Sequence, residues 1–311
     1  MKRLILIDGH AILHRAYHAL PPLTTSKGEL VNAVFGFCSM LLKIRDELSP
    51  SYFTVAFDLP KPTFRHKIFA SYQAQRPAMA EELSGQIEKI KEVLKTLGIP
   101  VYEAEGFEAD DVIGTLAKQA IDHKPYTISE VIIVTGDRDM LQLVDEQTKV
   151  YMLLKGISEA TLYDKEKVEE KFGLEPRQIS DYKALIGDPS DNYFGVSGIG
   201  PKTAQELLSC FKTLEQIYNN LDKMDKKIKD KLNKGKEQAV LGKKLATIVT
   251  DVPVELDSEK ARVENFNTPR VRKLFEKLEF KSLVPRLAGQ ASKKNAKQKA
   301  PENNNEQLKL V

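Results

Sequence analysis

The sequence predicts an α/β fold, a mostly parallel sheet flanked by helices, followed by a helical region. Three observations predict it. Short apolar runs typical of buried strands recur through the first half of the chain. Segments with helical apolar spacing separate these runs, and such alternation is typical of a parallel sheet. From about Ile179 onward the apolar spacing is mainly helical.

Composition favours a globular protein of one large or two smaller domains. The chain has 311 residues, of which 41% are apolar, and this can supply a core. The first apolar run has only four residues before Asp8, too short for a signal peptide, and no later run approaches membrane-spanning length. We therefore expect a cytoplasmic protein. Cys38 and Cys210 have no Cys or His at metal-binding spacing, which predicts reduced thiols.

Acidic residues follow the predicted strands of the first half. In open α/β sheets the carboxyl ends of the strands converge at one edge, where sites are built. Acids in a helix's first turn also complement its dipole, but that explains one or two acids rather than three close together. The predicted strands and following acids are 4–7 with Asp8, 52–57 with Asp58, 99–102 with Glu108, Asp110 and Asp111, and 131–135 with Asp137 and Asp139.

The helices expected between these strands follow from apolar spacing. They cover 31–48, a run from about residue 83 that Gly98 ends, and a helix that starts near Ala109. Residues 61–77 differ, because basic and aromatic side chains are mixed there. Such mixing suits contact with nucleic-acid backbone and bases, although a solvated helix with aromatic anchors would look the same.

The helical second half adds two acids and a glycine-rich turn. Asp188 and Asp191 lie three residues apart in Gly187-Asp188-Pro189-Ser190-Asp191-Asn192. The glycine turn, residues 198–203, precedes a helix expected over 204–208. Glycines before a helix let backbone N–H groups face a phosphate, and Lys202 adds charge, although a plain helix-turn-helix remains open. The turn lacks the ending of a Walker loop.

Two further segments are basic or polar. A lysine run over 223–236 fits either a duplex-facing patch or a solvated helix face. From Gly289 the chain has almost no apolar residues, which predicts a disordered tail or the stump of a linker.

Collected together, the acids number nine, and without cations they would repel one another. Their oxygen ligands, with no His or Cys among them, predict Mg²⁺ or Mn²⁺, and two such ions could drive phosphodiester hydrolysis. The other 35 acids would then face 47 basic residues, a balance of +12 that favours a polyanionic partner. The nine are Asp8, Asp58, Glu108, Asp110, Asp111, Asp137, Asp139, Asp188 and Asp191.

These motifs, in their order, resemble those of the flap endonuclease and 5′-to-3′ exonuclease family, and most of all the N-terminal nuclease domain of bacterial DNA polymerase I. The motifs are Asp8-Gly9, Phe57-Asp58, Glu108-Ala109-Asp110-Asp111, Thr135-Gly136-Asp137-Arg138-Asp139, Gly187 to Asn192 and Gly198-Ile199-Gly200-Pro201-Lys202-Thr203-Ala204.

The resemblance implies a PIN-like nuclease domain over 1–178 with an arch at about 61–97, a helix-three-turn-helix region over 179–288, and a tail over 289–311. It implies cleavage of 5′ flaps and 5′ ends of duplex DNA and removal of RNA primers in replication and repair. A polymerase partner in cis or in trans, a monomeric state and association with the nucleoid follow from the same resemblance.

The resemblance also assigns roles to residues. One metal group would draw on Asp8, Asp58, Glu108, Asp110 and Asp111, and the other on Asp137, Asp139, Asp188 and Asp191. The glycine turn would grip the duplex, with K⁺ as a possible ion there. The DNA contacts would be Arg15, Arg65, Lys67, Tyr72, Gln73, Arg76, Gly198, Gly200, Lys202 and Thr203.

The arch departs from the family pattern. Many members have Tyr-Lys-x-x-x-Arg or a close variant, whereas this chain has Tyr72-Gln73-Ala74-Gln75-Arg76. The missing lysine leaves Arg76, one helical turn after Gln73, as the expected catalytic cation. Two other functions stay open: a DNA-binding scaffold without activity, which need not keep all nine acids, and a PIN-type ribonuclease, which needs only about four.

Overall fold

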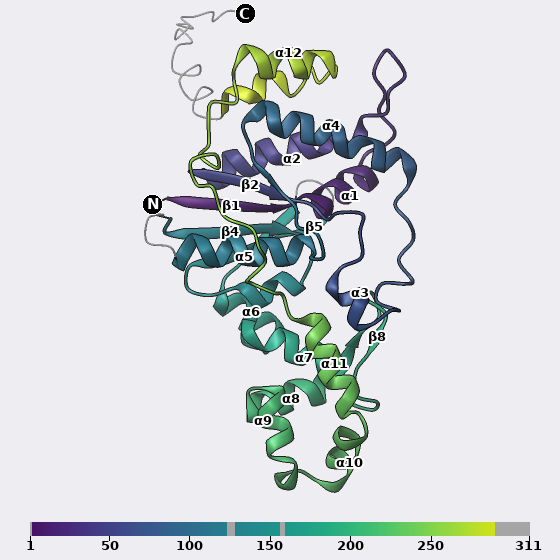
Figure 1. The fold of residues 1–311 in the computed structure, drawn as a ribbon. Coiled ribbons are helices and arrows are strands. Elements are labelled where there is room, and N and C mark those ends of the chain that lie inside the picture. The colour runs from purple at the N-terminus through teal and green to yellow at the C-terminus, as the bar shows by residue number, and fades with distance from the viewer. Residues whose placement is uncertain (1, 123–127, 156–158, 290–311) are drawn as a thin grey trace, which may run out of the picture.

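The computed structural model describes residues 2–122, 128–155 and 159–289 (Figure 1). The tail expected from Gly289 therefore lies, beyond Gly289 itself, outside the described residues. A six-stranded sheet has the order β3-β2-β1-β4-β5-β6. Its first five strands are parallel, and β6 runs antiparallel to β5, which the sequence did not predict. The strands are β1 Arg3–Asp8, β2 Tyr52–Ala56, β3 Val101–Tyr102, β4 Glu130–Thr135, β5 Thr148–Lys155 and β6 Glu159–Tyr163.

Helices cover both faces of the sheet, which confirms the predicted α/β fold (Figure 1). Alternate residues of β1 enter different cores, because side chains alternate across a strand. Ile5 and Ile7 pack in one core with α2 and α4, whereas Leu4 and Leu6 pack in the other with α5. The helices of this half are α1 Gly9–Ala19, α2 Asn32–Leu48, α3 Phe64–Ile68, α4 Glu81–Leu97, α5 Ala109–Asp122 and α6 Lys165–Phe172.

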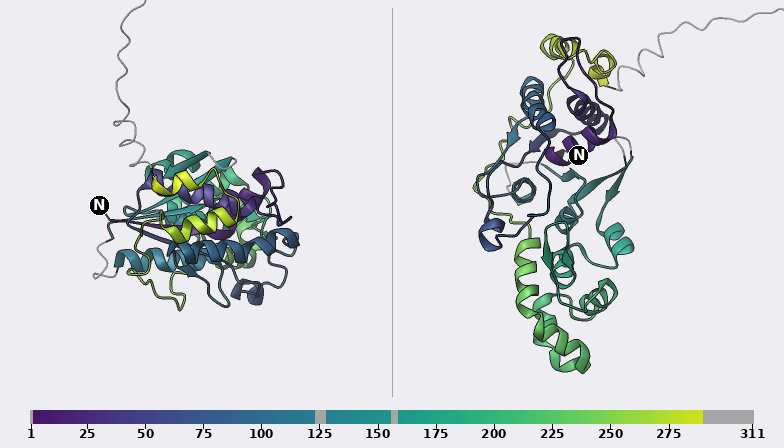
Figure 2. Two further views of the ribbon diagram at one scale, coloured as in Figure 1. Left: turned by 90° about the horizontal axis from the view of Figure 1, so that it is seen from above. Right: turned by 90° about the vertical axis from the view of Figure 1, so that its right-hand side faces the viewer.

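A second, smaller core belongs to the helices that follow. Leu185, Leu208, Ile217 and Leu232 pack together there, away from the sheet (Figures 1 and 2). A short hairpin of β7 Gly187–Asp188 and β8 Tyr193–Phe194 separates the first of these helices from the rest. The helices are α7 Ile179–Ile186, α8 Pro201–Phe211, α9 Leu214–Asn219, α10 Lys226–Lys234 and α11 Lys236–Ala246.

After α11 the chain returns to the sheet. Ile248 and Val252 pack with the core around α5, and α12 (Pro269–Lys277) packs with the core around α2 and α4. The expected helical region over 179–288 is therefore not one body: residues 179–246 surround their own core, and 248–287 complete the first domain. Four 3-10 segments, η1 Asp139–Leu143, η2 Pro176–Gln178, η3 Leu221–Lys223 and η4 Val284–Ala288, join these elements.

Within the described residues, no helix combines the length and apolar character needed to cross a bilayer.

Candidate active site

A cavity of about 1060 Å³ lies at the carboxyl edge of the sheet, between α1, the arch and the β7–β8 hairpin. Four strand ends contribute to its wall, as expected for an open α/β sheet. Seven of the nine predicted acids line the cavity: Asp8, Asp58, Glu108, Asp110, Asp137, Asp139 and Asp191. The other two, Asp111 and Asp188, do not appear in this lining.

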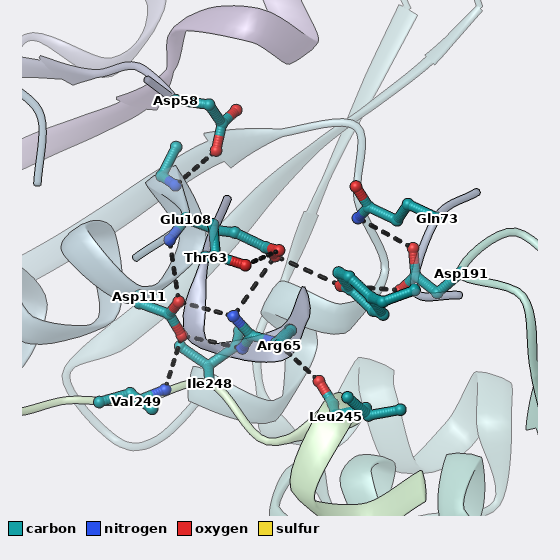
Figure 3. Close-up of polar contacts among 12 residues, drawn as sticks. Asp58, Thr63, Arg65, Gln73, Glu108, Asp111, Asp191, Leu245, Ile248 and Val249 are labelled. Carbon is teal, nitrogen blue, oxygen red and sulfur yellow. Dashed lines mark hydrogen bonds and ion pairs between the residues drawn. The ribbon is translucent and has the colours of Figure 1, made fainter. Parts of the chain in front are cut away.

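The first set of acids, the strand-end group, consists of Asp8, Asp58, Glu108 and Asp110. Asp8 ends β1 and caps α1, accepting hydrogen bonds from Ala11 N at 2.9 Å and Thr135 Oγ1 at 2.8 Å. Asp58 Oδ1 accepts a hydrogen bond from the N–H of Ala109 at 2.7 Å (Figure 3). These bonds fix the carboxylates of two neighbouring strands beside the start of α5.

Burial makes the strand-end group costly to ionise without a cation. Burial raises the pKa of Asp8 to about 6 and that of Glu108 to about 7. The pKa of Asp110 is raised well above its usual value, first by burial and then by the charges of Asp137 and Asp8. The pKa values of these three carboxyls are therefore raised mainly because burial disfavours their charged forms, a cost that a nearby cation would reduce.

The second set, the hairpin group, consists of Asp139, Asp188 and Asp191. Their carboxylate oxygens lie within 4.8 Å of one another, and all three residues are buried. Lys183 of α7 lies between two of them, forming an ion pair with Asp139 and donating to Asp188 Oδ2 at 2.5 Å. Burial raises the pKa of Asp139 to about 7, with Asp137 adding to the shift and Lys183 opposing it. A lysine thus already partly neutralises the hairpin group.

The arch contacts the hairpin group at Asp191. Gln73 Nε2 donates to Asp191 Oδ1 at 3.1 Å (Figure 3). An Arg76 guanidinium N–H donates to the same oxygen at 2.7 Å, and Tyr72 Oη lies 3.3 Å from Asp191 Oδ2. The expected helical turn over 72–76 is wrong: these residues form turns, and Gln73 has a φ of 55°. Gln73 and Arg76 nevertheless converge on one carboxylate, because the turn rather than a helix brings them together.

Asp111 requires a correction. Its carboxylate is fully buried and accepts two hydrogen bonds from Arg65, at 2.7 and 2.9 Å, as well as bonds from the N–H groups of Glu108 and Val249 (Figure 3). Arg65 also donates to the carbonyls of Leu245 and Thr247. The expectation that Asp111 joins the metal ligands does not match this geometry, because protein donors occupy both of its oxygens.

The same pair corrects the role expected for Arg65. Only 2% of Arg65 is exposed, and although Arg65 borders the cavity, its guanidinium donates to Asp111 and to two backbone carbonyls. Tyr72 is buried too, at 4%. Of the other expected DNA contacts, Arg15 lines the cavity and donates to Leu153 O at 2.8 Å, and Lys67 is exposed. The Arg65–Asp111 pair connects α3, α5 and the chain after α11, and so stabilises the position of α3 within the arch.

Two residues that contact the acids, Lys183 and His10, escaped the sequence analysis. The sequence could have indicated Lys183 as a partner of Asp188, because Lys183 precedes Asp188 by about one and a half helical turns. His10 Nδ1 lies 3.1 Å from both the backbone nitrogen and Oδ2 of Asp58, so the expectation that no histidine accompanies the acids is wrong. Burial alone would raise the pKa of Asp58, but the hydrogen bond and charge of His10 lower it below its usual value.

The glycine turn lies at the start of α8. Gly198 has a φ of +78°, and Gly200 precedes Pro201 at the first helical position. Gly198, Gly200 and Lys202 are exposed, and Thr203 is half-buried. The ammonium of Lys231, from α10, donates to the carbonyl of Gly198 at 2.9 Å. The glycine turn therefore presents exposed backbone next to Lys231 of α10.

Two family models match consecutive parts of the chain. The model described as 5′-3′ exonuclease, N-terminal resolvase-like domain, matches residues 3–173, and that described as 5′-3′ exonuclease, C-terminal SAM fold, matches residues 174–269.

Among curated proteins, DNA polymerase I of Caldicellulosiruptor bescii is 43% identical over 287 residues, which are 92% of this chain and 33% of the relative. DNA polymerase I of Bacillus subtilis is also 43% identical over 287 residues, which are 92% of this chain and 32% of the relative. The chain thus spans about a third of the length of these relatives.

Solved structures share the fold at low identity. The T5 D15 protein co-crystallised with metal ions has a TM-score of 0.67 at 20% identity, covering 80% of this chain and 90% of that one. The catalytic core of Rad2 in complex with DNA substrate has a TM-score of 0.56 at 18% identity, covering 92% of both chains.

Proposed function

This chain belongs to the 5′-3′ exonuclease family of nucleases, and from that premise we propose that it hydrolyses phosphodiester bonds at 5′ flaps and 5′ ends of duplex DNA. RNA primers paired to DNA are further substrates of the proposed reaction. One observation carries the proposal: seven carboxylates from separate strand ends and a hairpin line one cavity. A cavity with so many buried acids suits positively charged ions and the phosphates they bind.

The donor set fits divalent cations. Asp8, Asp58, Glu108 and Asp110 would hold one ion, and Asp139, Asp188 and Asp191 the other, with Asp137 between them. Oxygen ligands alone favour Mg²⁺ or Mn²⁺. When bound, two such ions activate an attacking water and stabilise the leaving oxygen of a phosphodiester. The raised pKa values of Asp8, Glu108 and Asp139 support this proposal, because a nearby cation would relieve the cost of their ionisation.

The arch would supply the cation that the protein itself brings to the phosphate. Arg76 is half exposed and lines the cavity, so its guanidinium can exchange Asp191 for a phosphate without unfolding its surroundings. A guanidinium binds two phosphate oxygens at once and stabilises charge that develops in the transition state. Gln73 can donate a hydrogen bond to the same phosphate, and buried Tyr72 positions the turn.

The duplex would bind along residues 179–246, which we propose as the DNA-binding unit. The exposed N–H groups of the glycine turn and Lys202 would contact phosphates at the start of α8. K⁺, which the resemblance suggested here, does not fit, because the Gly198 carbonyl already accepts a hydrogen bond from the Lys231 ammonium. A second cation beside that ammonium would be repelled, so Lys231 supplies the charge instead.

The wider setting follows from the relatives. Because they are DNA polymerases of about three times this length, we propose that a polymerase acts with this nuclease, in the same chain or beside it. A monomer that works on nucleoid DNA is part of the same proposal.

The test is cleavage of a 5′-labelled flap duplex in Mg²⁺, beside a single-stranded RNA of the same sequence. We expect products at the flap junction, none in EDTA, and none from Asp110→Asn. Binding without cleavage by the wild type would identify a DNA-binding scaffold, and preferential cleavage of the RNA would identify a PIN-type ribonuclease. Either result would reject the proposed function.

A further inference from the structure

Phe194 is an exposed aromatic residue between the two regions proposed to contact DNA. Its exposed fraction is 82%, against 41 to 46% for the other large apolar side chains exposed in the described part of the chain. One exposed apolar residue needs no explanation by itself. The surroundings of Phe194 make this one informative.

The hairpin fixes the direction of the Phe194 ring. In β8, Tyr193 packs inward with Tyr72 and Leu245, and because side chains alternate along a strand, Phe194 points outward. A Cβ on Gly187 or Gly195 would lie 2.4 or 2.3 Å from neighbouring backbone atoms, so the hairpin backbone packs against the end of α7 without spare room. The ring is therefore held in solvent by a rigid frame.

The same hairpin connects three parts of the proposed nuclease. Its turn carries Asp191 of the hairpin group, and Asn192 Nδ2 donates to Ser71 O of the arch at 2.8 Å. At the other end of the hairpin, just before the glycine turn, the N–H of Val196 donates a hydrogen bond to Leu185 O at 2.8 Å. Figure 1 shows β8 beside α3 and α11, between the sheet and the helices α8 to α10. A duplex whose backbone binds the glycine turn while its end enters the cavity must pass this hairpin.

We propose that Phe194 stacks on a nucleobase at the end of the bound duplex, next to the phosphate that is cleaved. This inference rests on the proposed function, since it assumes a duplex end at the cavity. A flap junction exposes one face of its terminal base pair, and an aromatic ring covers such a face without regard to sequence. Phe194 would thus help the enzyme to recognise the junction itself, a role that phosphate contacts alone cannot fulfil.

The experiment compares Phe194→Ala and Phe194→Trp with the wild type. The probe is a 5′-flap duplex that carries 2-aminopurine in the terminal base pair at the junction, titrated in EDTA so that no cleavage occurs. Leu23→Ala is the matched control, because Leu23 is an exposed apolar residue, at 41%, outside both the cavity lining and residues 179–246. Circular dichroism melting of each variant verifies the fold, which truncation of an exposed ring should leave intact.

We expect Phe194→Ala to weaken binding about tenfold, within the range known for one base–aromatic stack, and to abolish the quenching of 2-aminopurine on binding. Phe194→Trp should retain both, and Leu23→Ala should match the wild type. Unchanged affinity and unchanged quenching in Phe194→Ala would overturn the proposal and assign the ring to a protein contact. Because these readings need no divalent cation, wild-type protein that binds but does not cleave would reject the nuclease proposal alone.

Discussion

The strand-end group and the hairpin group share one cavity, yet the chain neutralises them differently. Within the described residues, no lysine or arginine forms an ion pair with Asp8, Asp58 or Asp110, and Glu108 lies 3.4 Å from Arg65. Lys183 and Arg76, by contrast, pair with all three members of the hairpin group. The difference teaches that the number of carboxylates in a cluster does not by itself set how strongly the cluster needs a metal ion. Every acid of the hairpin group has a lysine or arginine partner, whereas three of the four strand-end acids have none in the part of the chain that the structure describes and depend on charge from outside the chain.

The largest expected effect is loss of catalysis from the strand-end group. Asp110→Asn should lower the single-turnover rate on a 5′ flap by about 10³-fold, because Asp110 itself has no lysine or arginine partner among the described residues that could take over the charge balance. Asp188→Asn should cost about 10²-fold, because Lys183 still holds Asp139 in place. Quenched-flow cleavage in saturating Mg²⁺ measures both rates. Equal losses of rate in the two variants would contradict the proposed difference between the strand-end group and the hairpin group. Filter binding in EDTA shows whether each variant still binds the flap.

The next effect concerns Asp111, one of the two predicted acids outside both groups. Asp111→Asn should lower the free energy of unfolding by about 3 to 5 kcal/mol, because it leaves the buried Arg65 without its charge partner. Asp137→Asn is the control: it removes a charge that repels Asp110 and Asp139, and should not destabilise the protein without metal. Urea unfolding in EDTA measures both. A stable Asp111→Asn variant would show that the ion pair is dispensable.

The contrast between these acids marks how far the sequence could predict the site. Acids after apolar strands predict convergence at one edge, because parallel strands align their carboxyl ends, and that inference placed six of the seven strand-following acids in the cavity. Asp110 and Asp111 are neighbours in the chain, but helical geometry directs one into the cavity and the other toward Arg65. Which of two adjacent acids turns inward depends on packing between distant segments, which local patterns do not record.

A third prediction tests the arch on the hairpin group. Arg76→Ala should lower the single-turnover rate by about 10²-fold, because a bidentate cation at the phosphate is lost. Gln73→Lys should raise that rate, since an ammonium would join Arg76 near Asp191. Both rates are measured on the same 5′ flap at pH 8. If both variants cleave at the wild-type rate, the contact between the arch and Asp191 has a structural role and does not contribute to catalysis.

A fourth prediction uses pH to distinguish the effect of carboxylate ionisation on stability from the effect of metal binding. The folded-state pKa values of Asp8 and Glu108, about 6 and 7, exceed their usual values, so the folded protein holds more protons than the unfolded chain between about pH 4 and 7. Without metal, stability should therefore fall as pH rises through this range. Mg²⁺ should raise Tm by several degrees at pH 8 and little at pH 5, as measured by calorimetry. A Tm in EDTA that rises from pH 5 to pH 8 would contradict this sign.

The smallest expected effect lies outside the cavity, at the glycine turn. There the Lys231 ammonium contacts the carbonyl that a bound cation would otherwise contact. Because Lys231 donates to the Gly198 carbonyl, exchanging KCl for NaCl at equal ionic strength should change duplex affinity less than about twofold, since both salts screen phosphates alike. Lys231→Ala removes that ammonium and frees the carbonyl, so the variant should bind several-fold more weakly and recover partly in K⁺ but not in Na⁺. Fluorescence anisotropy of a labelled duplex measures these affinities. Preference of the wild type for K⁺ would mean that the lysine moves aside and the turn binds the ion itself.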